Sequence, residues 1–358
     1  MASSSKPCIL LPNAPVYSSV VIDALHDPGT PTGLARAETT GAIAVTPLAT
    51  PQGTTILVGV ASWTDPSMTA PGVFYPEGIS TPEGRLRYYA DRYPVVEVDS
   101  TYYAIPARRM AELWTARTPD GFIFDVKAHA LMTGQPSEVN RLPKELRTSL
   151  PASLAGKSRI YATDLPDELR GHVWRLFLDA LEPLRASERL GAILLQYPKW
   201  VGPSRANAAM IEDARTRLDG WPAAVELRNR AWFDDRTRQR TLDLLRRNQL
   251  AYVAVDSPPG FQSSVPAVAE ATSGRLAVVR FHGRNTETWE ARVTQVSQRF
   301  RYLYDETQLR EWLPMIRAIS EQTEEVHLVF NNCYGNYATT NALEMSGLLL
   351  RAGIAQRR

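Results

Sequence analysis

Short apolar runs, rich in β-branched residues, alternate with segments of helical periodicity from residue 54 to the C-terminal region. Short runs of this kind, bounded by turn-forming residues, are typical of buried strands. The pattern predicts eight strands, at residues 55–61, 95–99, 122–127, 192–196, 223–227, 251–255, 277–280 and 326–330.

Two of the intervening segments show a clear helical face. Residues 172–184 and residues 308–322 each place a row of apolar side chains on one side of a helix. Eight strands alternating with helices favour an α/β fold, a single (β/α)₈ TIM barrel, over an open doubly wound sheet. Two intervals are long: residues 130–191 form an insertion between the third and fourth strands, and residues 281–325 precede the eighth strand.

Residues 1–53 differ in character from the rest of the chain. They are rich in Ala, Thr, Pro, Ser and Gly and lack a sustained hydrophobic period. Such a composition is typical of a segment that does not bury a core of its own. The sequence therefore predicts a flexible N-terminal extension at 1–53 and one barrel domain at 54–358.

Polar residues alternate with apolar ones in several predicted strands. The strands of a parallel barrel are covered on both faces and ordinarily read as continuous Val, Ile and Leu. Because successive side chains point to opposite faces and the apolar face packs on the helices, the polar set points into the barrel. The alternation places on inner faces Glu97 and Asp99, Asp125 and Lys127, Glu226 and Arg228, and Arg280 and His282.

These polar residues are predicted to lie at the carboxyl ends of their strands, where barrel enzymes carry their active sites. An unpaired buried charge costs several kcal/mol, so such a set is retained if it pairs or forms a site. The sequence therefore predicts a ligand site, with a structural ion-pair network as the alternative. We assign catalysis to Glu97, Glu226 and His282, and substrate binding to Trp63, Asp99, Tyr102, Lys127, Gln196, Arg228, Asp256, Arg280, Arg284, Asn331 and Asn332.

The arginines indicate an anionic ligand. Arg280 and Arg284 flank His282 and Gly283 after the seventh strand, a region where barrels often bind phosphate. The planar guanidinium group of arginine binds phosphate or carboxylate through paired hydrogen bonds. Lys127 or Arg228 completes the predicted anion site. Aromatic residues after several strands add a stacking surface, so a nucleotide, a nucleic-acid end or a phosphosugar fits the predicted site.

The predicted reaction is that of a hydrolase or lyase, with Glu97 or Glu226 as the general base and His282 as the acid. The alternatives are a two-carboxylate glycosidase, a nucleic-acid or nucleotide binding protein without turnover, and a barrel that scaffolds partners through its insertion. No nucleotide cofactor is predicted, because no glycine-rich phosphate loop follows a strand. A divalent metal held by Glu97, Glu226, Asp256 and His282 is the alternative to a site without cofactors.

Stability distinguishes a catalytic pair of glutamates from a structural one. If Glu97 and Glu226 are catalytic, replacing either by Gln is expected to leave the free energy of unfolding nearly unchanged. If they only neutralise neighbouring cations, the same substitutions are expected to cost roughly 3–5 kcal/mol.

The composition of the chain limits the cellular compartments and the binding partners that we expect. The 40 Lys and Arg nearly balance the 38 Asp and Glu, for a net charge of +2. This balance argues against a surface that is basic throughout and binds nucleic acid, although a local basic groove remains compatible with it. Two cysteines, Cys8 and Cys333, exclude a disulfide framework and favour a reducing, cytoplasmic location. No stretch approaches the roughly 18 apolar residues of a transmembrane helix, so no membrane partner is expected.

Several motifs together resemble domain-of-unknown-function family 72, the YecE-like proteins. The segment Val96-Glu97-Val98-Asp99-Ser100-Thr101-Tyr102-Tyr103 is similar to the family's Val-Glu-Ile-Asn-Ser-Thr-Phe-Tyr signature. The resemblance spans residues 54–350 and implies a TIM barrel without implying an activity. Further matching segments are Phe74-Tyr75-Pro76, Gln196-Tyr197-Pro198, Val225-Glu226-Leu227-Arg228, Val255-Asp256-Ser257-Pro258, Arg280-Phe281-His282-Gly283-Arg284-Asn285 and Phe330-Asn331-Asn332.

The chain departs from the family pattern in three places. Thr133-Gly134 stands where Thr-His is usual, Ala61-Ser62 stands where Ser-Gly is usual, and a second early Trp before Phe74 is missing. Without the usual histidine, a mechanism that needs it would depend on His129 bending into the site. The alternative is that His129 is a solvated loop residue.

Overall fold

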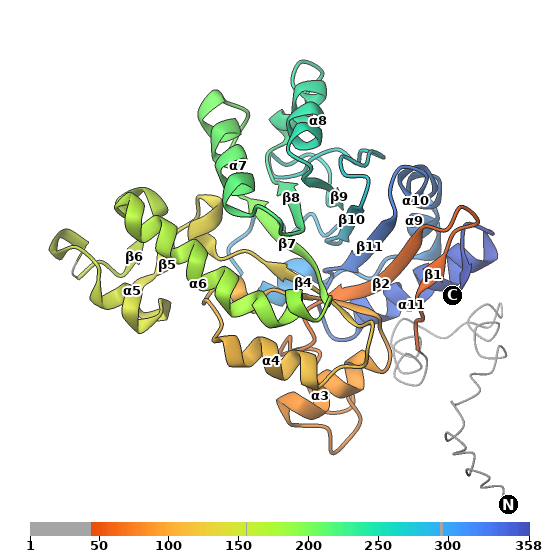
Figure 1. The fold of residues 1–358 in the computed structure, drawn as a ribbon. Coiled ribbons are helices and arrows are strands. Elements are labelled where there is room, and N and C mark those ends of the chain that lie inside the picture. Colours follow the sequence, from red (N-terminus) through yellow and green to blue (C-terminus); the bar gives the residue numbers. More distant parts are fainter. Residues whose placement is uncertain (1–43, 155, 294–295) are drawn as a thin grey trace, which may run out of the picture.

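A computed structural model describes residues 44–154, 156–293 and 296–358, and it forms a closed barrel (Figure 1). Eight parallel strands follow one another around the barrel in chain order, and pairing of the last with the first closes it. The predicted TIM barrel is confirmed, with strand ends shifted by at most two residues. The strands are β2 Thr55–Ala61, β3 Val95–Val98, β4 Ile123–Lys127, β7 Leu190–Tyr197, β8 Ala223–Leu227, β9 Ala251–Asp256, β10 Leu276–Phe281 and β11 Glu325–Phe330.

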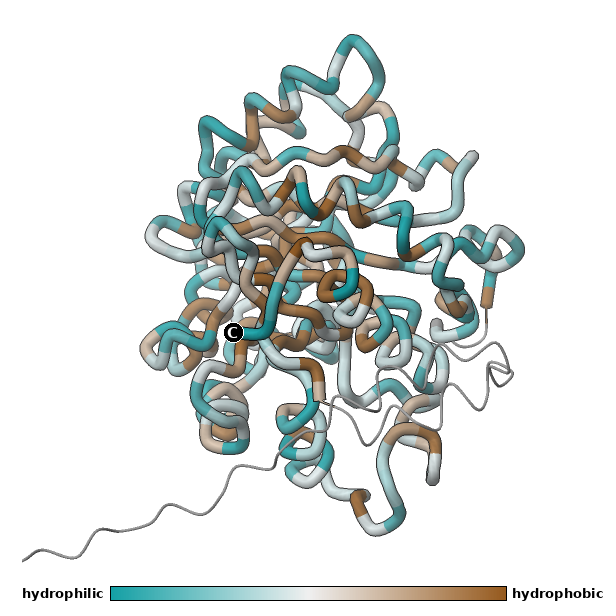
Figure 2. Tube along the Cα trace, turned by 90° about the vertical axis from the view of Figure 1, so that its right-hand side faces the viewer, coloured by the Kyte–Doolittle hydropathy of each residue, from teal (hydrophilic) through white to brown (hydrophobic). Residues whose placement is uncertain are grey.

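Helices surround the barrel strands. Apolar positions gather in the interior of the molecule and polar positions on its outside (Figure 2). The outer faces of the strands are therefore shielded from water. The helices are α3 Pro82–Ala90, α4 Arg108–Ala116, α6 Asp167–Ala186, α7 Arg205–Arg217, α8 Arg238–Arg247, α9 Glu306–Arg310, α10 Leu313–Ser320 and α11 Tyr337–Arg351.

Helix α6 confirms the helix predicted at 172–184 and extends it at both ends. Its buried face includes Val173, Phe177 and Leu181, which recur at helical spacing. Asp167 in its first turn and Arg185 in its last turn suit the helix dipole. The amphipathic period and these charged ends together account for a helix of 20 residues here.

The helix predicted at 308–322 is two helices, α9 and α10. The break lies just before Pro314, which occupies the first turn of α10. A proline inside one continuous helix would lack the N–H that bonds to the preceding turn, so the chain starts a new helix there. Trp312, at the break, is buried and serves as the N-cap residue of α10.

The connection between β9 and β10 contains no helix, although a helix was predicted after every strand. Residues 257–275 are all described and form an irregular loop. Pro258, Pro259 and Gly260 follow the strand directly, and such a run does not start a helix. The loop is fixed instead by Thr272, whose hydroxyl donates to Leu250 O at 2.6 Å and accepts from Tyr252 N at 2.8 Å.

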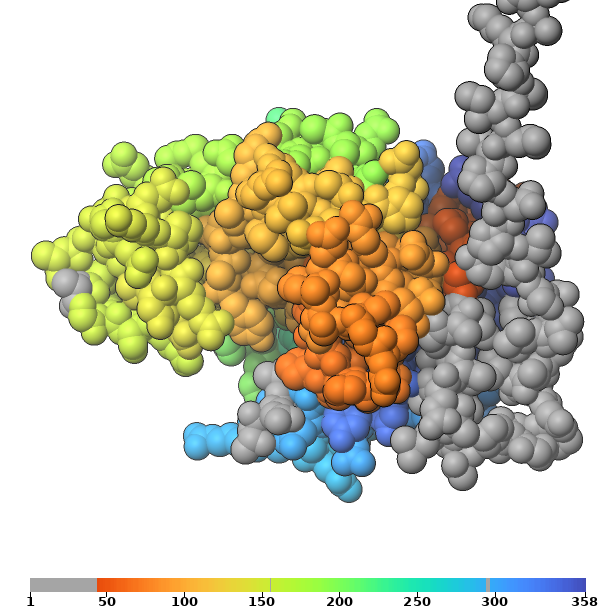
Figure 3. Space-filling model, turned by 90° about the horizontal axis from the view of Figure 1, so that it is seen from below, coloured from red at the N-terminus to blue at the C-terminus, as the bar shows by residue number. Residues whose placement is uncertain are grey.

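The predicted insertion between the third and fourth barrel strands forms a lobe that projects beside the barrel (Figure 3). A short antiparallel pair, with Ser137 opposite Ile160, ties its two arms together. Its elements are η4 Ala130–Thr133, β5 Ser137–Glu138, η5 Val139–Arg141, α5 Lys144–Thr148, η6 Ala152–Leu154, β6 Arg159–Ile160 and η7 Ala162–Asp164.

The end of the predicted N-terminal extension packs on the barrel, contrary to the boundary expected at residue 53. Strand β1, Leu48–Ala49, pairs antiparallel with β2 and with the C-terminal strand β12, Gln356–Arg357. Leu48 is fully buried and Val45 N donates to Arg92 O at 2.7 Å. Burial of these apolar side chains holds residues 44–53 in place, whereas the predicted flexibility of residues 1–43 concerns residues outside those described.

One of the polar residues predicted for the carboxyl ends lies deeper in the barrel. Asp125, in the middle of β4, accepts from His327 Nδ1 of β11 at 2.9 Å, and His327 Nε2 lies 2.6 Å from Glu325 Oε1. Gly191 of β7 leaves the room for this pair, because a Cβ there would lie 2.5 Å from the Asp125 carboxylate. The Asp125–His327 pair is therefore part of the barrel's internal packing. Across the described residues, no helix is long and apolar enough to span a membrane.

Candidate functional site at the barrel mouth

A buried arginine bridges two glutamates across the inside of the barrel. Arg280 of β10 donates through Nη2 to Glu97 Oε1 of β3 at 2.6 Å, and its Nη1 pairs with Glu226 Oε2 of β8. All three side chains are at most 1% exposed. The predicted inward orientation of these residues is therefore confirmed, and the Arg280 guanidinium is occupied by carboxylates.

The second oxygen of Glu226 is also occupied. Gln196 Nε2 donates to Glu226 Oε1 at 2.7 Å and Arg228 Nε donates at 2.6 Å. Burial acts to raise the pKa of Glu226, but Arg280, Arg228 and His282 together hold it well below its ordinary value. A carboxylate so stabilised in its ionised form is a poor proton acceptor, so the general-base role predicted for Glu226 fits this geometry badly.

His282 is enclosed and uncharged at neutral pH. Its ring nitrogens lie 2.8 Å from Asn331 Nδ2 and 3.0 Å from Arg228 Nη2. Burial, aided by Arg228, lowers the pKa of His282 to about 3. At neutral pH there is almost no imidazolium to give up a proton, so the role of general acid predicted for His282 is poorly supported.

Lys127 and Asp99 lie on the other side of the mouth and are not neutralised in the same way. The Lys127 amine lies 4.9 Å from the centre of the Tyr102 ring and makes no ion pair with a residue in the described ranges. Burial and the cations Arg280 and Arg228 lower the pKa of Lys127 to about 8, against the opposing effect of Glu97. Burial raises the pKa of Asp99, and it does the same to Glu97. Burial thereby favours the neutral form of all three side chains, Lys127, Asp99 and Glu97.

Asp256 and Arg284 form a second pair at the ends of β9 and β10. Arg284 donates to both Asp256 oxygens, from Nε at 3.0 Å and from Nη2 at 2.7 Å, and Nη2 also reaches Glu311 Oε2 at 2.8 Å. Asp256 accepts two more bonds, from Tyr304 OH and Trp312 Nε1, each at 2.7 Å. A groove of about 530 Å³ is lined in part by this pair. The guanidinium predicted to hold an anion is thus paired with carboxylates.

The remaining predicted binding residues divide into two groups. Tyr102, whose hydroxyl donates to Gln135 Oε1 at 2.8 Å, lies at the mouth beside Lys127. Asn332 is fully buried and donates to Tyr302 O and to Asn341 Oδ1, each at 2.8 Å, which is a structural role. Trp63 is buried as well and its ring packs edge-on against Trp114, as a core residue does.

Comparison with known proteins identifies the family. The sequence model described as "Protein of unknown function DUF72" matches residues 57–357. The chain belongs to the DUF72 family. The resemblance seen in the sequence motifs is therefore confirmed, and the barrel with its mouth is the DUF72 domain of this chain.

Relatives of this DUF72 domain match most of its length. The UPF0759 protein YunF of Bacillus subtilis (strain 168) is 28% identical over 297 residues, which cover 82% of this chain and 94% of YunF. A solved DUF72 structure from Thermotoga maritima has a TM-score of 0.64 at 27% identity, covering 82% of this chain and 99% of that one. A DUF72 structure from Enterococcus faecalis has a TM-score of 0.63 at 26% identity, covering 82% and 97%. These likenesses support the barrel fold.

The loop after β10 forms a roof over the mouth of this DUF72 barrel. The ring of Trp289 lies 5.9 Å from that of His282, and Phe300 lies 6.2 Å from it. Trp289 Nε1 donates to Ser263 Oγ at 2.8 Å, and the neighbouring Glu290 pairs with Lys199 at 3.1 Å, so the roof is fixed to the loops after β9 and β7. These roof residues were not among the site residues predicted from the sequence, in which the length of the interval 281–325 was the available signal.

Arg299, also in the roof, was likewise not among the site residues predicted from the sequence. Burial and the nearby Arg228 lower the pKa of Arg299, while Glu290 and Tyr103 oppose that effect. Its Nε is buried without a hydrogen-bond partner among the described residues. Arg228 therefore lies close enough to repel both the Arg299 guanidinium and the Lys127 amine.

Both predictions for His129 are wrong: it is not a solvated loop residue, and it does not bend into the site at the barrel mouth. It is fully buried at the base of the insertion, with Nε2 3.3 Å from Ser137 Oγ. Burial lowers its pKa to about 4, so it is neutral. It stabilises the insertion by packing, and within the described ranges it makes no polar contact with the mouth residues.

The four predicted metal ligands do not come together as a set. Asp256 is held by Arg284, while Glu226 is held by Arg280 and Arg228. Nowhere in the described ranges do three or more His, Cys, Asp or Glu side chains form a group that could hold a metal ion.

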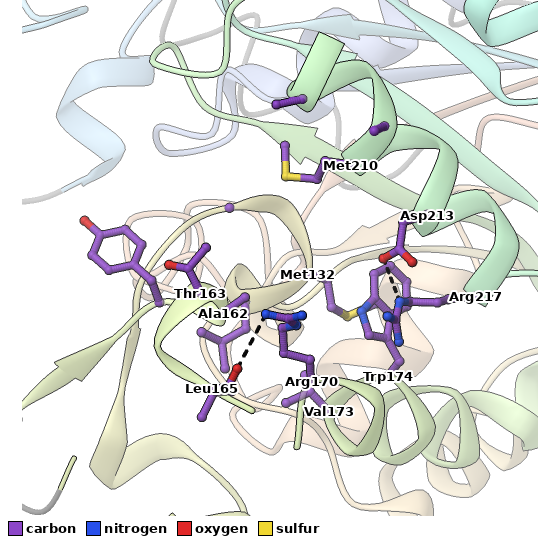
Figure 4. Close-up of a pocket in the computed structure, with 15 residues that line it drawn as sticks. Met132, Ala162, Thr163, Leu165, Arg170, Val173, Trp174, Met210, Asp213 and Arg217 are labelled. Carbon is purple, nitrogen blue, oxygen red and sulfur yellow. Dashed lines mark hydrogen bonds and ion pairs between the residues drawn. The ribbon is translucent and has the colours of Figure 1, made fainter. Parts of the chain in front are cut away.

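A cavity of about 490 Å³ lies away from the mouth, between the insertion and helices α6 and α7 (Figure 4). Much of its lining is apolar and includes Met132, Trp174 and Met210. At its edge Arg217 Nε pairs with Asp213 Oδ2 at 2.7 Å. None of the predicted site residues lines this cavity, so it is distinct from the candidate site.

Proposed function

We propose that this DUF72 protein is a hydrolase or lyase that acts on a phosphate-bearing ligand at the barrel mouth. The observation that carries the proposal is the cationic group formed by Lys127, Arg228 and Arg299. Arg280 and Arg284 are occupied by carboxylates. Arg228 shares the Glu226 carboxylate with Arg280, whereas Lys127 and Arg299 make no ion pair within the described residues, and Arg228 lies close enough to lower the pKa of both. A bound dianion would relieve their mutual repulsion, and the predicted anion site therefore moves to Lys127, Arg228 and Arg299.

The surroundings of these cations suit a phosphate joined to a flat or ring-shaped group. Arg228 is 21% exposed and lies 5.5 Å from the centre of the Trp289 ring, and Lys127 lies beside the Tyr102 ring. Aromatic faces of this kind stack on bases and on sugar rings. A nucleotide, a nucleic-acid end and a phosphosugar all meet this description.

Turnover is favoured over simple binding by the groups whose pKa values are drawn toward neutrality. Lys127, with a pKa of about 8, exchanges protons readily near neutral pH, and Asp99, whose pKa is raised, lies close to it. We therefore reassign acid–base chemistry from Glu226 and His282 to Lys127 and Asp99. A glycosidase mechanism is not proposed, because both of its carboxylates, Glu97 and Glu226, are held by Arg280.

A binding protein without turnover is the second candidate. Trp200 is 59% exposed after β7 and Tyr103 is 46% exposed after β3, so large aromatic side chains stand in solvent on two rim loops. Single-stranded nucleic acid stacks on such residues. Binding to an oligonucleotide with a steep salt dependence, and without conversion of any phosphate-bearing compound, would favour this candidate.

Inorganic phosphate is the simplest probe of the proposed anion site. We expect millimolar phosphate to raise the melting temperature by a few degrees, since a ligand that binds only the folded state stabilises it by mass action. Arg299→Ala is expected to lose most of this rise. The matched control is Arg292→Ala, which removes an exposed arginine of the same loop and is expected to keep the rise. An equal rise in both variants would remove Arg299 from the site, and no rise in the unaltered protein would contradict the proposal.

A further inference from the structure

Lysine is the rare cation of this chain. Five lysines, at positions 6, 127, 144, 157 and 199, stand against 35 arginines. Lys144, Lys157 and Lys199 are exposed, and position 6 lies outside the described residues. The cations that neutralise buried carboxylates at the mouth, Arg280 and Arg228, are arginines. Lys127 is thus the enclosed lysine among those described.

The difference between the two residues is chemical. A guanidinium stays protonated at any physiological pH, whereas an amine deprotonates and becomes a nucleophile when it is desolvated beside other cations. Lys127 meets both conditions, because it is surrounded by protein and faces Arg280 and Arg228. At pH 7 a pKa of about 8 leaves roughly one amine in ten unprotonated, against about one in three thousand for an ordinary lysine.

The geometry leaves the Lys127 amine free to react. Its backbone is fixed at the end of β4, where its carbonyl oxygen accepts from Thr101 Oγ1 at 2.6 Å. The amine itself has neither a hydrogen bond nor an ion pair with any residue that the structure describes, and its side chain keeps partial access to the mouth. Among nearby carboxylates, Glu97 is committed to Arg280, and Asp99 makes no ion pair within the described ranges. Asp99 is thus available to carry protons.

We propose that the Lys127 amine forms an imine with the carbonyl carbon of a phosphate-bearing aldehyde or ketone, which makes the protein a lyase of that substrate class. The inference rests on the proposed function and specifies its reaction. The amine attacks the carbonyl carbon, the nitrogen loses two protons, and the carbonyl oxygen leaves with them as water. Asp99 carries the protons between nitrogen and oxygen. When protonated, the imine accepts the electron pair of the bond between the α and β carbons as that bond breaks. The hydroxyl on the β carbon gives up its proton, and that carbon leaves as an aldehyde or ketone. The α carbon of the resulting enamine takes up a proton, and addition of water to the imine then restores the amine and releases the second product.

Borohydride trapping tests the imine directly. The intact chain is incubated at pH 7 with glycolaldehyde phosphate, reduced with sodium borohydride, and the modified lysine is located by peptide mass spectrometry. We expect modification at Lys127 at least tenfold above that at Lys144, Lys157 or Lys199. The yield is expected to rise with pH with a midpoint near 8. Lys127→Arg keeps the charge and is expected to remove this adduct, whereas the matched control Lys144→Arg retains it.

The same experiment separates failure of the imine from failure of the anion site. A phosphate-dependent melting rise without an adduct at Lys127 would overturn the imine and leave the proposed anion site standing. Equal trapping of glycolaldehyde and glycolaldehyde phosphate, without a melting rise in phosphate, would retain the imine and overturn the anion site. Equal modification of all the lysines would show that Lys127 has no special reactivity. A cooperative melting transition of Lys127→Arg without phosphate would show that this variant is folded, and Lys127→Gln, which also lacks the amine, takes its place if it does not melt cooperatively. A folded variant that still gave this adduct at the level of the unaltered protein would overturn the imine at Lys127.

Discussion

Replacing Arg280 by methionine is expected to lower the free energy of unfolding by about 4 kcal/mol, the largest effect of any single substitution considered for this protein. The arginine joins Glu97 and Glu226 in a bridge that is almost completely buried. Without it, two carboxylates remain in the barrel interior facing one another without their shared cation. Chemical denaturation at pH 7.5 measures the loss.

The pH dependence of this loss identifies its cause. The carboxylates of the Arg280→Met variant gain a higher pKa in the folded state than in the unfolded state, so acid protonates them and favours folding of the variant. We therefore expect the difference in stability between the unaltered protein and the variant to shrink when the pH is lowered from 7.5 to 5. The matched control is Arg351→Met, an exposed substitution in the last turn of α11, expected to change stability by less than about 0.5 kcal/mol. A pH-independent loss would mean that lost packing, and not charge, causes the effect.

The same bridge reverses what the sequence led us to expect of its glutamates. On the hypothesis of catalytic carboxylates, Glu226→Gln was expected to be nearly neutral in stability. In the structure Glu226 accepts bonds from Arg280, Arg228 and Gln196, so the substitution leaves buried donors facing an amide NH₂ group. We therefore expect Glu226→Gln to lower the free energy of unfolding by several kcal/mol. The alternative prediction, a structural ion-pair network, describes Glu226 better than a catalytic role does.

The free energy of unfolding is expected to fall by about 3 kcal/mol between pH 7 and pH 10 because of His327 alone. Burial acts to lower the pKa of His327, but Asp125 and Glu325 raise it to about 10. Because the folded-state pKa lies above the unfolded value near 6.5, the stabilisation is complete below pH 6.5 and is lost as the pH rises through 10. Denaturation curves at several pH values measure it.

The comparison with a variant isolates this histidine from other titrating groups. His327→Gln removes the titration while keeping a polar side chain, and its stability curve is expected to lack the decline. Lys127 works in the opposite direction, since its lowered pKa favours the folded state as the pH rises, so the difference between the two curves is the quantity to use. His172→Gln, on helix α6, serves as the matched control and should follow the unaltered protein. Parallel curves for the unaltered protein and His327→Gln would contradict the prediction.

The barrel strands show most clearly which parts of the fold can be predicted from the sequence. All eight barrel strands are where the apolar runs predicted them, and α6 extends the predicted period. These features are local, because the alternation of side chains and the turn residues between the runs are written in neighbouring positions. The interruptions of the predicted helices are also encoded by neighbouring residues, but they were not predicted. Pro314 separates α9 from α10, and Pro258, Pro259 and Gly260 exclude a helix after β9.

The chemistry of the site was decided by contacts between strands far apart in sequence. Period two showed that Glu97, Glu226 and Arg280 face inward, but not that one guanidinium would join both glutamates across the barrel. Nor could it show that Asp125 would meet His327, which lies 202 positions away. Partners determine whether a buried acid is held ionised or drawn toward neutrality, because the Coulomb energy depends on distances that sequence spacing does not contain.

The sequence by itself thus determined the barrel, the inward-facing polar residues and the end of the barrel at which most of them gather. The tertiary structure decided which of them are already paired and which are free to act. Arg284, a predicted anion ligand, is paired with Asp256, whereas Lys127 makes no ion pair among the described residues and lies close to the cation Arg228. The physical reason is that a charge buried with its counter-ion is structural, while a charge buried without one retains its affinity for a ligand, and only the fold brings the counter-ions together.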